Sequence, residues 1–169
     1  PTKEVDGLLK LFSKSISNES KKIHANKIKL KFIGDTSIFT EPLQLKIKEI
    51  EKETFRNKRL VLNVALNYGG RLDIVNSVNK FYQNKKKVNK ITEKIINSGL
   101  YTKGQSDVDL LIRTGGQQRM SNFLLWQSAY AELFFSKKLW PDFDEKVFVD
   151  ALYFFQNTER KFGSISKST

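Results

Sequence analysis

The sequence predicts an α/β protein with a mostly parallel central sheet that helices cover on both faces. Three observations lead to this class. Short apolar runs of strand length alternate along the chain with longer stretches whose apolar residues recur at helical spacing. Two of the runs, "RLVLNVALN" and "VDLLIRT", are almost continuously apolar, as strands buried in parallel sheets are. A Gly-Gly pair follows each of these two runs, at the carboxyl end of the expected strand, where α/β sheets bind ligands.

The first part of the chain predicts a helix, a strand and a second helix. Helical spacing of apolar residues predicts a helix from Val5 to about His24. We expect His24, the only histidine, to be a solvated residue of that helix and not a metal ligand. Residues 28–33 then alternate between apolar side chains and lysine, as a half-buried strand does. Pro42 stands near the start of the next helix. The apolar stripe of that helix contains Leu43, Ile47 and Ile50.

The middle of the chain continues the alternation. Residues 59–67, "RLVLNVALN", predict a buried parallel strand, and the glycines at 69 and 70 turn the chain into a helix. The lysine run at 85–87 ends that helix, a short helix follows around 91–96, and a loop begins at Gly99. We expect one face of the longer helix to be buried. Its residues are Leu72, Val75, Val78 and Tyr82.

The last part of the chain predicts two more strands and two more helices. "VDLLIRT" is a buried strand, residues 124–131 form a helix, and "ELFF" is a short strand. "WPDF" then interrupts the chain, because proline cannot continue a ladder. Asp144 is expected to cap the last helix. The apolar face of that helix comprises Val147, Phe148, Ala151, Leu152 and Phe155.

Length and composition predict one soluble domain. A chain of 169 residues can bury a substantial core, so we assign residues 1–169 to a single domain. Without cysteine the chain has no disulfide, no thiolate zinc ligand and no thiol nucleophile. No segment approaches the roughly 20 consecutive apolar residues that cross a bilayer. The N-terminus carries no signal-like run either, so we expect a cytoplasmic protein.

The net charge of +12 is compatible with a nucleic-acid-binding protein. Most of the excess is lysine spread over expected helix surfaces, and the sequence shows no ladder of base-stacking aromatic residues. We therefore expect no nucleic-acid partner. A basic nucleic-acid binder is the alternative, and its affinity would fall steeply with salt. The arginines are more informative, because three of the six adjoin Gly-Gly pairs. These three are Arg71, Arg113 and Arg119.

The stretch "LLIRTGGQQRMSN" combines cations with a tight turn. Arg113 ends a buried strand, the glycines allow a turn with exposed backbone N–H groups, and Arg119 and Ser121 return at the start of the next helix. Two guanidiniums, a hydroxyl and a helix N-terminus at one point predict a site for a phosphate or diphosphate. The alternative is an ordinary strand-to-helix loop in which Ser121 caps the helix and both arginines are solvated.

Glu132 is a carboxylate within the apolar stretch "AYAELFF". An unpaired buried carboxylate is costly, so Glu132 either faces solvent or has a cationic partner. Beside a diphosphate the expected partner is Mg²⁺, which binds one or two carboxylates together with phosphate oxygens. The second glycine motif, "NYGGR", gives a weaker indication. Arg71 either binds an anion there or, as we favour, supports the structure by pairing with Asp73 or a neighbouring strand.

Three long motifs indicate a family. "NVALNYGGRLDIV", "DLLIRTGGQQRMSNFLLWQSAYAELFF" and "LWPDFDEKVFVDAL" resemble the corresponding segments of the cis-prenyltransferases, in particular the bacterial undecaprenyl diphosphate synthases. The resemblance implies a Mg²⁺-dependent transferase that condenses isopentenyl diphosphate onto an allylic diphosphate, usually farnesyl diphosphate. Its product would be a long cis-polyprenyl diphosphate, a carrier lipid for cell-wall synthesis. The resemblance also implies a homodimer and peripheral contact of the product with membranes.

The resemblance assigns roles to particular residues as well. Arg113, Arg119 and Ser121, with the backbone near Met120, should hold the diphosphate of the isopentenyl substrate. Glu132 matches the family's Mg²⁺-binding glutamate. The implied active site therefore combines a diphosphate clamp with one metal ligand.

The chain departs from the family's pattern in three places. The family's catalytic aspartate and its Gly-rich loop belong to a segment before Pro1, so no residue here matches that aspartate. We therefore expect residues 1–169 to be an N-terminally truncated domain, roughly the C-terminal two thirds of the family's length, and inactive by itself. Gln117 replaces a glutamate, which removes a negative charge near the diphosphate. Lys161 replaces the arginine of an Arg-x-Gly motif that reaches a partner's substrate, and lysine lacks the bidentate fork.

A second reading is a non-catalytic subunit or remnant that dimerises through its apolar C-terminal half and supports a catalytic prenyltransferase. An idle site would not explain why Arg113, Arg119, Ser121 and Glu132 occur together. Binding of isopentenyl diphosphate, with and without a partner, separates the two readings.

Overall fold

The computed structural model describes residue 19 and residues 22–83 and 90–160. Three features of the prediction lie outside the described residues, namely most of the helix from Val5, the lysine run at 85–87, and Lys161. The chain divides into two compact units, Pro1–Tyr68 and Gly69–Thr169, and each is described by itself. The assignment of the whole chain to one domain stays a prediction.

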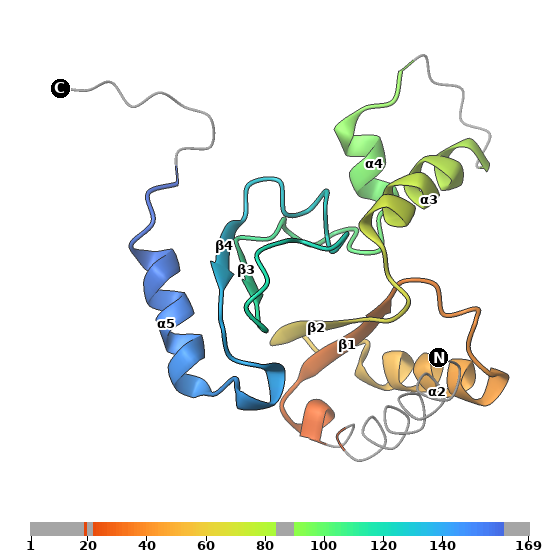
Figure 1. Cartoon of the computed structure of the whole chain (residues 1–169). Coiled ribbons are helices and arrows are strands. Elements are labelled where there is room, and N and C mark those ends of the chain that lie inside the picture. Colours follow the sequence, from red (N-terminus) through yellow and green to blue (C-terminus); the bar gives the residue numbers. More distant parts are fainter. Residues whose placement is uncertain (1–18, 20–21, 84–89, 161–169) are drawn as a thin grey trace. The chain divides into compact units, whose positions relative to one another are not determined.

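The first unit contains a parallel pair of strands and a helix (Figure 1). β1 (Ile28–Ile33) and β2 (Leu60–Ala65) run parallel, and Ile28 pairs with Leu60 at the start of the ladder. α2 (Glu41–Thr54) connects the two strands and lies against β1. The strand predicted at residues 28–33 and the helix predicted after it are both confirmed.

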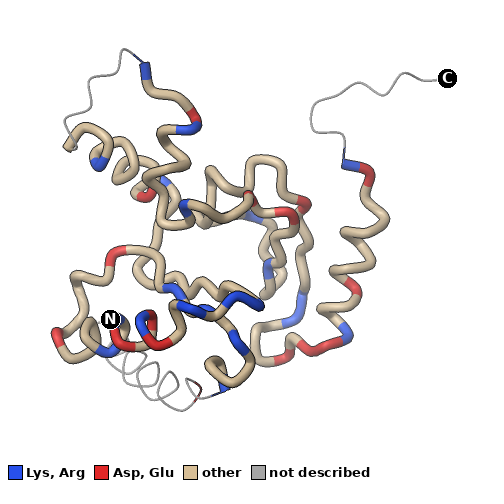
Figure 2. The backbone as a smooth tube through the Cα atoms, turned by 180° about the vertical axis from the view of Figure 1, so that it is seen from behind, with Lys and Arg blue, Asp and Glu red and all other residues tan. Residues whose placement is uncertain are grey.

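β1 is half-buried, as its sequence predicted, but its burial does not alternate residue by residue. Lysine stands at two of its positions (Figure 2), and these residues are Lys29 and Lys31. Leu30 and Ile33 are buried. His24, just before the strand, lies in a helical segment and is exposed, as expected for a solvated residue.

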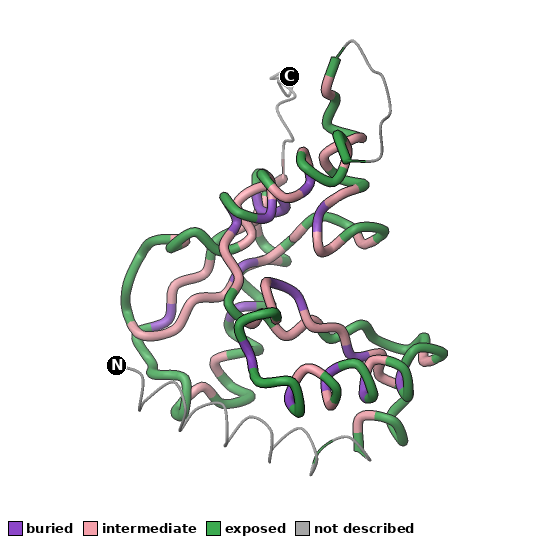
Figure 3. The backbone as a smooth tube through the Cα atoms, turned by 90° about the vertical axis from the view of Figure 1, so that its right-hand side faces the viewer, coloured by how far each residue is buried: buried purple, intermediate pink, exposed green. Residues whose placement is uncertain are grey.

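The core of the first unit lies on the inner side of α2 (Figure 3). Leu43, Ile47 and Ile50 are buried, as their spacing predicted, and Leu30 of β1 packs in one cluster with Ile50. Full burial of such a side chain stabilises the fold by about 1.5–3 kcal/mol. These contacts explain why the sequence pattern alone located α2.

Side chains of α2 also satisfy backbone groups of β1. Leu30 N–H donates to Thr54 Oγ1 (3.1 Å), and Phe32 N–H donates to Glu51 Oε1 (2.8 Å). The Thr54 hydroxyl in turn donates to the carbonyl of Ile50 (2.9 Å). Because buried N–H groups need partners, these two side chains take the place of a further strand beside β1.

β2 is less buried than its sequence predicted. Leu60, Val61 and Leu62 are 54%, 39% and 41% exposed. Among the described strands, β2 has one hydrogen-bonded neighbour, β1, so its other edge has no ladder partner there. The prediction of a strand buried like one in the interior of a sheet is therefore wrong for this stretch.

The second unit contains the remaining elements. α3 (Gly70–Gln83) and α4 (Glu93–Gly99) lie side by side, and β3 (Leu110–Arg113) pairs in parallel with β4 (Glu132–Phe135) (Figure 1). A 3₁₀ turn, η1 (Trp140–Asp142), leads into the last helix. The short helix, both strands and the interruption at proline are confirmed, but β3 is mostly half-buried and not buried, with Leu111 its one buried residue.

α5 (Glu145–Gln156) has the predicted cap and contacts β4. The carboxylate of Asp144 accepts the N–H of Val147 (3.0 Å). Ala151 is buried, but Phe148 and Leu152, which the pattern placed on the inner face, are 45% and 43% exposed. The inner face of α5 is therefore narrower than its sequence predicted. No helix within the described residues is long and apolar enough to cross a membrane.

The helix α3 is confirmed, but its predicted inner face is wrong. Leu72, Val75 and Tyr82 are exposed, and the buried positions are Asp73 and Ser77. The Ser77 hydroxyl donates to the carbonyl of Ile96 (2.6 Å), which joins α3 to α4. The Asp73 carboxylate accepts the N–H of Tyr101 (2.9 Å) and the amide of Gln127 (3.1 Å). This inner face is polar because its partners are loop backbone and an amide, which an apolar pattern does not detect.

The helix predicted at residues 124–131 is also wrong. Residues 121–130 form a series of turns and bends. The backbone is left-handed at Ser121, Asn122 and Leu124, with φ values of 48°, 63° and 45°. Such values are incompatible with the start of a right-handed helix. Ser121 is therefore not a helix cap, and no helix begins beside it.

The α/β class with parallel strands is confirmed. In the residues that the structure describes, the parallel pairing occurs as two two-stranded ladders, one in each unit.

Candidate functional site

The first part of the site is the turn that follows β3. Arg113 is the last residue of that strand, and Gly115 and Gly116 adopt φ values of 87° and 75°, which glycine tolerates best. Their N–H groups donate to the carbonyls of Lys138 (2.7 Å) and Ser136 (2.9 Å). The expectation that these N–H groups are exposed is therefore wrong, because they already hold the turn against the chain after β4.

The guanidinium of Arg113 closes the loop after this turn. Its Nη1 donates to Ser121 Oγ (2.8 Å) and to the main-chain carbonyl of Arg119. Arg113 and Met120 are half-buried, whereas the Arg119 side chain is exposed. The predicted convergence of Arg113, Ser121 and the chain at Arg119 is thus present. It is built by hydrogen bonds and not by a helix N-terminus.

Arg113 keeps donors for a ligand. A guanidinium has five N–H donors, and both of the bonds above come from Nη1. In the part of the chain that the structure describes, the edge formed by Nε and Nη2 remains available. That edge is the one that binds carboxylate or phosphate through two parallel hydrogen bonds. Arg119 stands in the same loop with an exposed side chain and contacts Arg113 through its main-chain carbonyl, so a second cation is available for a dianion or trianion.

The second glycine motif belongs to the same site. The Arg71 N–H donates to Asn122 Oδ1 (2.9 Å), and the Gly70 N–H donates to the Asn122 carbonyl (2.7 Å). The start of α3 is therefore bound to the residue next to Ser121. Sequence reasoning assigned no role to Asn122, although asparagine is one of the few residues that commonly adopt left-handed backbone angles.

Glu132 lies at the other end of the β3–β4 ladder. It pairs with Leu110, while Arg113 pairs with Phe135. The two site residues are thus three positions apart along the strands, about 10 Å at roughly 3.3 Å per residue. The structure brings together Arg113, Ser121 and the loop at Arg119, and it does not bring Glu132 to them.

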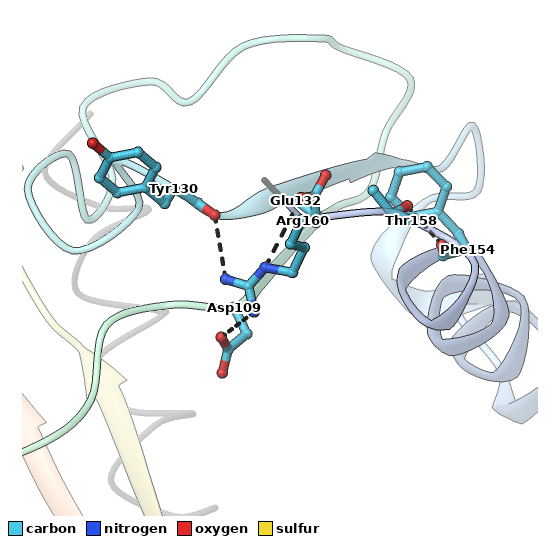
Figure 4. A network of polar contacts seen from close by, with 6 residues as sticks. All are labelled: Asp109, Tyr130, Glu132, Phe154, Thr158 and Arg160. Carbon is cyan, nitrogen blue, oxygen red and sulfur yellow. Dashed lines mark hydrogen bonds and ion pairs between the residues drawn. The ribbon is translucent and has the colours of Figure 1, made fainter. Parts of the chain in front are cut away.

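The carboxylate of Glu132 belongs to a separate polar network (Figure 4). Its Oε1 is 4.0 Å from Nε of Arg160. Nη1 of the same guanidinium contacts Asp109 Oδ1 (2.6 Å), and Nη2 donates to the carbonyl of Tyr130 (3.4 Å). The cationic partner of Glu132 here is an arginine, which was one of the two outcomes that its apolar surroundings predicted.

These surroundings do not fit the metal-diphosphate clamp predicted from the sequence. Mg²⁺ in such a clamp shares oxygen ligands between carboxylates and the bound phosphates. Glu132 is at the opposite end of the ladder from Arg113, and the cation near its carboxylate is the guanidinium of Arg160, whose Nε is 4.0 Å away. The described residues contain no group of three histidine or acidic side chains that could hold a metal ion. The metal-binding role of Glu132 stays a prediction.

The comparisons with known proteins agree on one family. Residues 1–163 match the model of the prenyltransferase family described as undecaprenyl diphosphate synthase. The chain is 49% identical over 167 residues to ditrans,polycis-undecaprenyl-diphosphate synthase ((2E,6E)-farnesyl-diphosphate specific) of Pasteurella multocida (strain Pm70), which covers 96% of this chain and 70% of that protein. It is 47% identical over 167 residues to the protein of the same name from Escherichia coli (strain K12), which covers 96% and 66%.

A solved structure gives the same result. Lavandulyl diphosphate synthase from Lavandula x intermedia, in complex with dimethylallyl diphosphate, superposes with a TM-score of 0.91. The identity is 34%, and the match covers 97% of this chain and 73% of that chain. The chain spans 70% and 66% of the length of the two curated relatives above, or about two thirds.

Proposed function

Since the chain belongs to the cis-prenyltransferase family of undecaprenyl diphosphate synthases, we propose that its Arg113 site binds isopentenyl diphosphate for transfer to an allylic diphosphate. The observation that carries the proposal is the contact between Arg113 Nη1 and Ser121 Oγ (2.8 Å). This contact fixes the hydroxyl beside a guanidinium whose bidentate edge remains available. Arg119 and the backbone near Met120 complete the proposed diphosphate clamp.

The contribution of these residues to the reaction is binding and orientation. The clamp holds the diphosphate of the isopentenyl substrate, and its carbon chain must then face the allylic partner. Fixing two reactants in this way lowers the barrier because little translational and rotational freedom is lost in the transition state. When the allylic diphosphate departs, negative charge accumulates on it and a carbocation-like centre forms. None of the clamp residues takes part in that bond cleavage.

The proposed allylic substrate is farnesyl diphosphate, and the proposed product is a long cis-polyprenyl diphosphate. The names of the two curated relatives, farnesyl-diphosphate-specific undecaprenyl diphosphate synthases, support this choice. The lavandulyl diphosphate synthase has a similar fold but is in complex with a different allylic diphosphate, dimethylallyl diphosphate. The identity to the curated relatives is higher, 49% and 47% against 34%, and favours farnesyl diphosphate.

Dependence on Mg²⁺ and a cytoplasmic location are further parts of this proposal. The first is implied by the family resemblance, and the second was predicted from the sequence. A homodimer is a third part, supported by exposed apolar residues on α5. These are Phe148, Val149, Leu152, Tyr153 and Phe154.

The same exposed apolar residues of α5 favour the second candidate function, a subunit that supports a catalytic partner. The two functions differ in whether the clamp is used. A supporting subunit with an idle site would not bind isopentenyl diphosphate.

Calorimetric titration of the chain with isopentenyl diphosphate tests the proposal. We expect measurable binding by the wild type and a loss of roughly tenfold to a hundredfold in Arg119→Ala, since a charged hydrogen-bonding group contributes about 1.5–3 kcal/mol. Arg119 is exposed and its side chain supports no packing that the structure describes, so the variant should fold normally. Arg56→Ala, which removes an exposed arginine of the first unit, is the matched control. Equal binding by both variants would refute the clamp.

A further inference from the structure

Asn122 joins the two glycine motifs of the second unit. We propose that it is a positioning residue that holds Ser121 in place for the diphosphate by binding the start of α3. This inference rests on the proposed function, because it concerns the same clamp. It adds a residue that touches neither Arg113 nor the expected anion.

Asn122 binds α3 through both its main chain and its side chain. Its carbonyl accepts the N–H of Gly70 (2.7 Å), and its Oδ1 accepts the N–H of Arg71 (2.9 Å). The first N–H groups of an α-helix have no partner within the helix, so an external acceptor is needed. A residue 51 positions further along the chain supplies it, which fixes the loop and the helix against each other.

Both glycines before Arg71 lie close to this loop. A Cβ atom added to Gly69 would lie 2.8 Å from Asn122 Nδ2, and one added to Gly70 would lie 2.9 Å from Leu125 Cγ. A larger residue at Gly70 would displace the loop, because the backbone N of Leu125 is 3.0 Å from the added Cβ as well, whereas a larger residue at Gly69 would push the Asn122 amide away. The Gly-Gly pair of "NYGGR" therefore has a packing role, in addition to allowing a turn.

The chemistry of asparagine suits this position. Its backbone φ is 63°, a left-handed value that asparagine adopts more readily than most residues. Its side chain is short and carries a carbonyl oxygen, which is the acceptor that a helix N-terminus needs. An alanine here would lose the acceptor and would also strain the backbone.

Ser121 depends on its neighbour. Its own φ is 48°, also left-handed, so its conformation needs support from the surrounding contacts. On one side its hydroxyl is held by Arg113 Nη1 (2.8 Å), and on the other side Asn122 is held by α3. Loss of the Asn122 side chain removes one of these two supports. The hydroxyl and the loop at Arg119 then sample other positions, and the affinity for diphosphate falls.

The test uses Asn122→Gly, which removes the side chain and keeps the left-handed backbone accessible. The matched control is Asn67→Gly, because Asn67 also has a positive φ (46°) and its side chain also bonds to the main chain, with Nδ2 donating to the carbonyl of Asp35 (3.2 Å). Both variants of the full chain are titrated with isopentenyl diphosphate, and their melting temperatures are compared. Exchange of the Arg71 amide hydrogen reports directly on the bond to Oδ1.

We expect Asn122→Gly to bind isopentenyl diphosphate roughly tenfold more weakly, which corresponds to the net contribution of about one hydrogen bond. The amide hydrogen of Arg71 should also exchange faster in this variant. Asn67→Gly should bind within about twofold of the wild type even if its melting temperature falls as much. Equal loss of affinity in both variants would mean general destabilisation and would overturn the inference. Unchanged binding by Asn122→Gly would also overturn it, and would leave the proposed function intact. No binding by the wild type would refute the proposed function, and the inference with it.

A double-mutant cycle with Ser121→Ala tests how Asn122 acts. If Asn122 positions the Ser121 hydroxyl, its replacement should cost little once that hydroxyl is absent. We expect the double variant to bind roughly tenfold more weakly than the wild type, close to the single variants, because coupled residues are not additive. An additive loss, roughly a hundredfold, would show that Asn122 does not act through Ser121 and would overturn the inference as stated.

Discussion

Replacing Arg113 with lysine separates the geometry of its guanidinium from its charge. In the wild type, Nη1 binds Ser121 Oγ (2.8 Å) and the carbonyl of Arg119, while Nε and Nη2 face away from those two contacts. Lysine keeps the positive charge, but its single ammonium group cannot bind both loop acceptors and also present a two-donor edge. The variant should therefore affect the loop and the ligand by different amounts.

The expected magnitudes follow from these contacts. The loop loses hydrogen bonds that are partly exposed, so the free energy of unfolding should fall by about 1 kcal/mol. The diphosphate loses a bidentate, charge-assisted contact of about 1.5–3 kcal/mol, which corresponds to roughly tenfold to a hundredfold weaker binding. Urea unfolding measures the first quantity, and titration with isopentenyl diphosphate measures the second.

Arg113→Ala is the companion variant, because it removes charge and geometry together. If Arg113→Lys bound isopentenyl diphosphate as tightly as the wild type while Arg113→Ala did not, charge alone would account for the site. The two-donor edge of Arg113 would then contribute nothing to diphosphate binding beyond its charge.

Three further predictions concern the fold. Thr54→Val should destabilise the chain by about 1–3 kcal/mol in urea unfolding, because it leaves the buried N–H of Leu30 without its acceptor. Asp144→Ala should cost about 1 kcal/mol in the same assay, since it removes the cap of α5. Hydrogen bonds from Ser37 hold the pKa of Asp35 below its ordinary value, so this contact stabilises above the ordinary carboxyl pKa and is lost as pH falls through the lowered one. Ser37→Ala should raise the pKa of Asp35 in an NMR titration; an unchanged pKa would contradict this cause.

The sequence predicted the first unit well because local rules agree there. Lysine alternation marked the strand at 28–33, and Leu43, Ile47 and Ile50 lie on one side of α2 because the helix buries an ordinary apolar stripe. The prediction failed at β2, where Leu60 is exposed. An apolar run predicts a strand, but the number of strands that pair with it depends on distant segments.

The second unit was harder to predict because distant polar contacts decide it. The buried face of α3 carries Asp73, whose partners Tyr101 and Gln127 lie 28 and 54 positions away. A hydrophobic pattern assigns such a face to solvent. The stretch after Asn122 reads as a helix in the sequence, yet its backbone is left-handed at Leu124, and Asn122 just before it is bound to the start of α3.

The candidate site was likewise predicted in one part and missed in another. The contact between Arg113 and Ser121 spans 8 positions, and the loop that joins them made it predictable. The separation of Glu132 from Arg113 depends on the register of β3 against β4, which places Glu132 opposite Leu110. Sequence spacing does not give that register.

A crystal structure of the chain with isopentenyl diphosphate tests the central claim most directly. The account predicts that the diphosphate lies within hydrogen-bonding distance of Nε and Nη2 of Arg113, the Ser121 hydroxyl and the guanidinium of Arg119. It also predicts that Asn122 still accepts the N–H of Arg71 in the complex. A diphosphate bound elsewhere, with the Arg113 loop empty, would contradict the account.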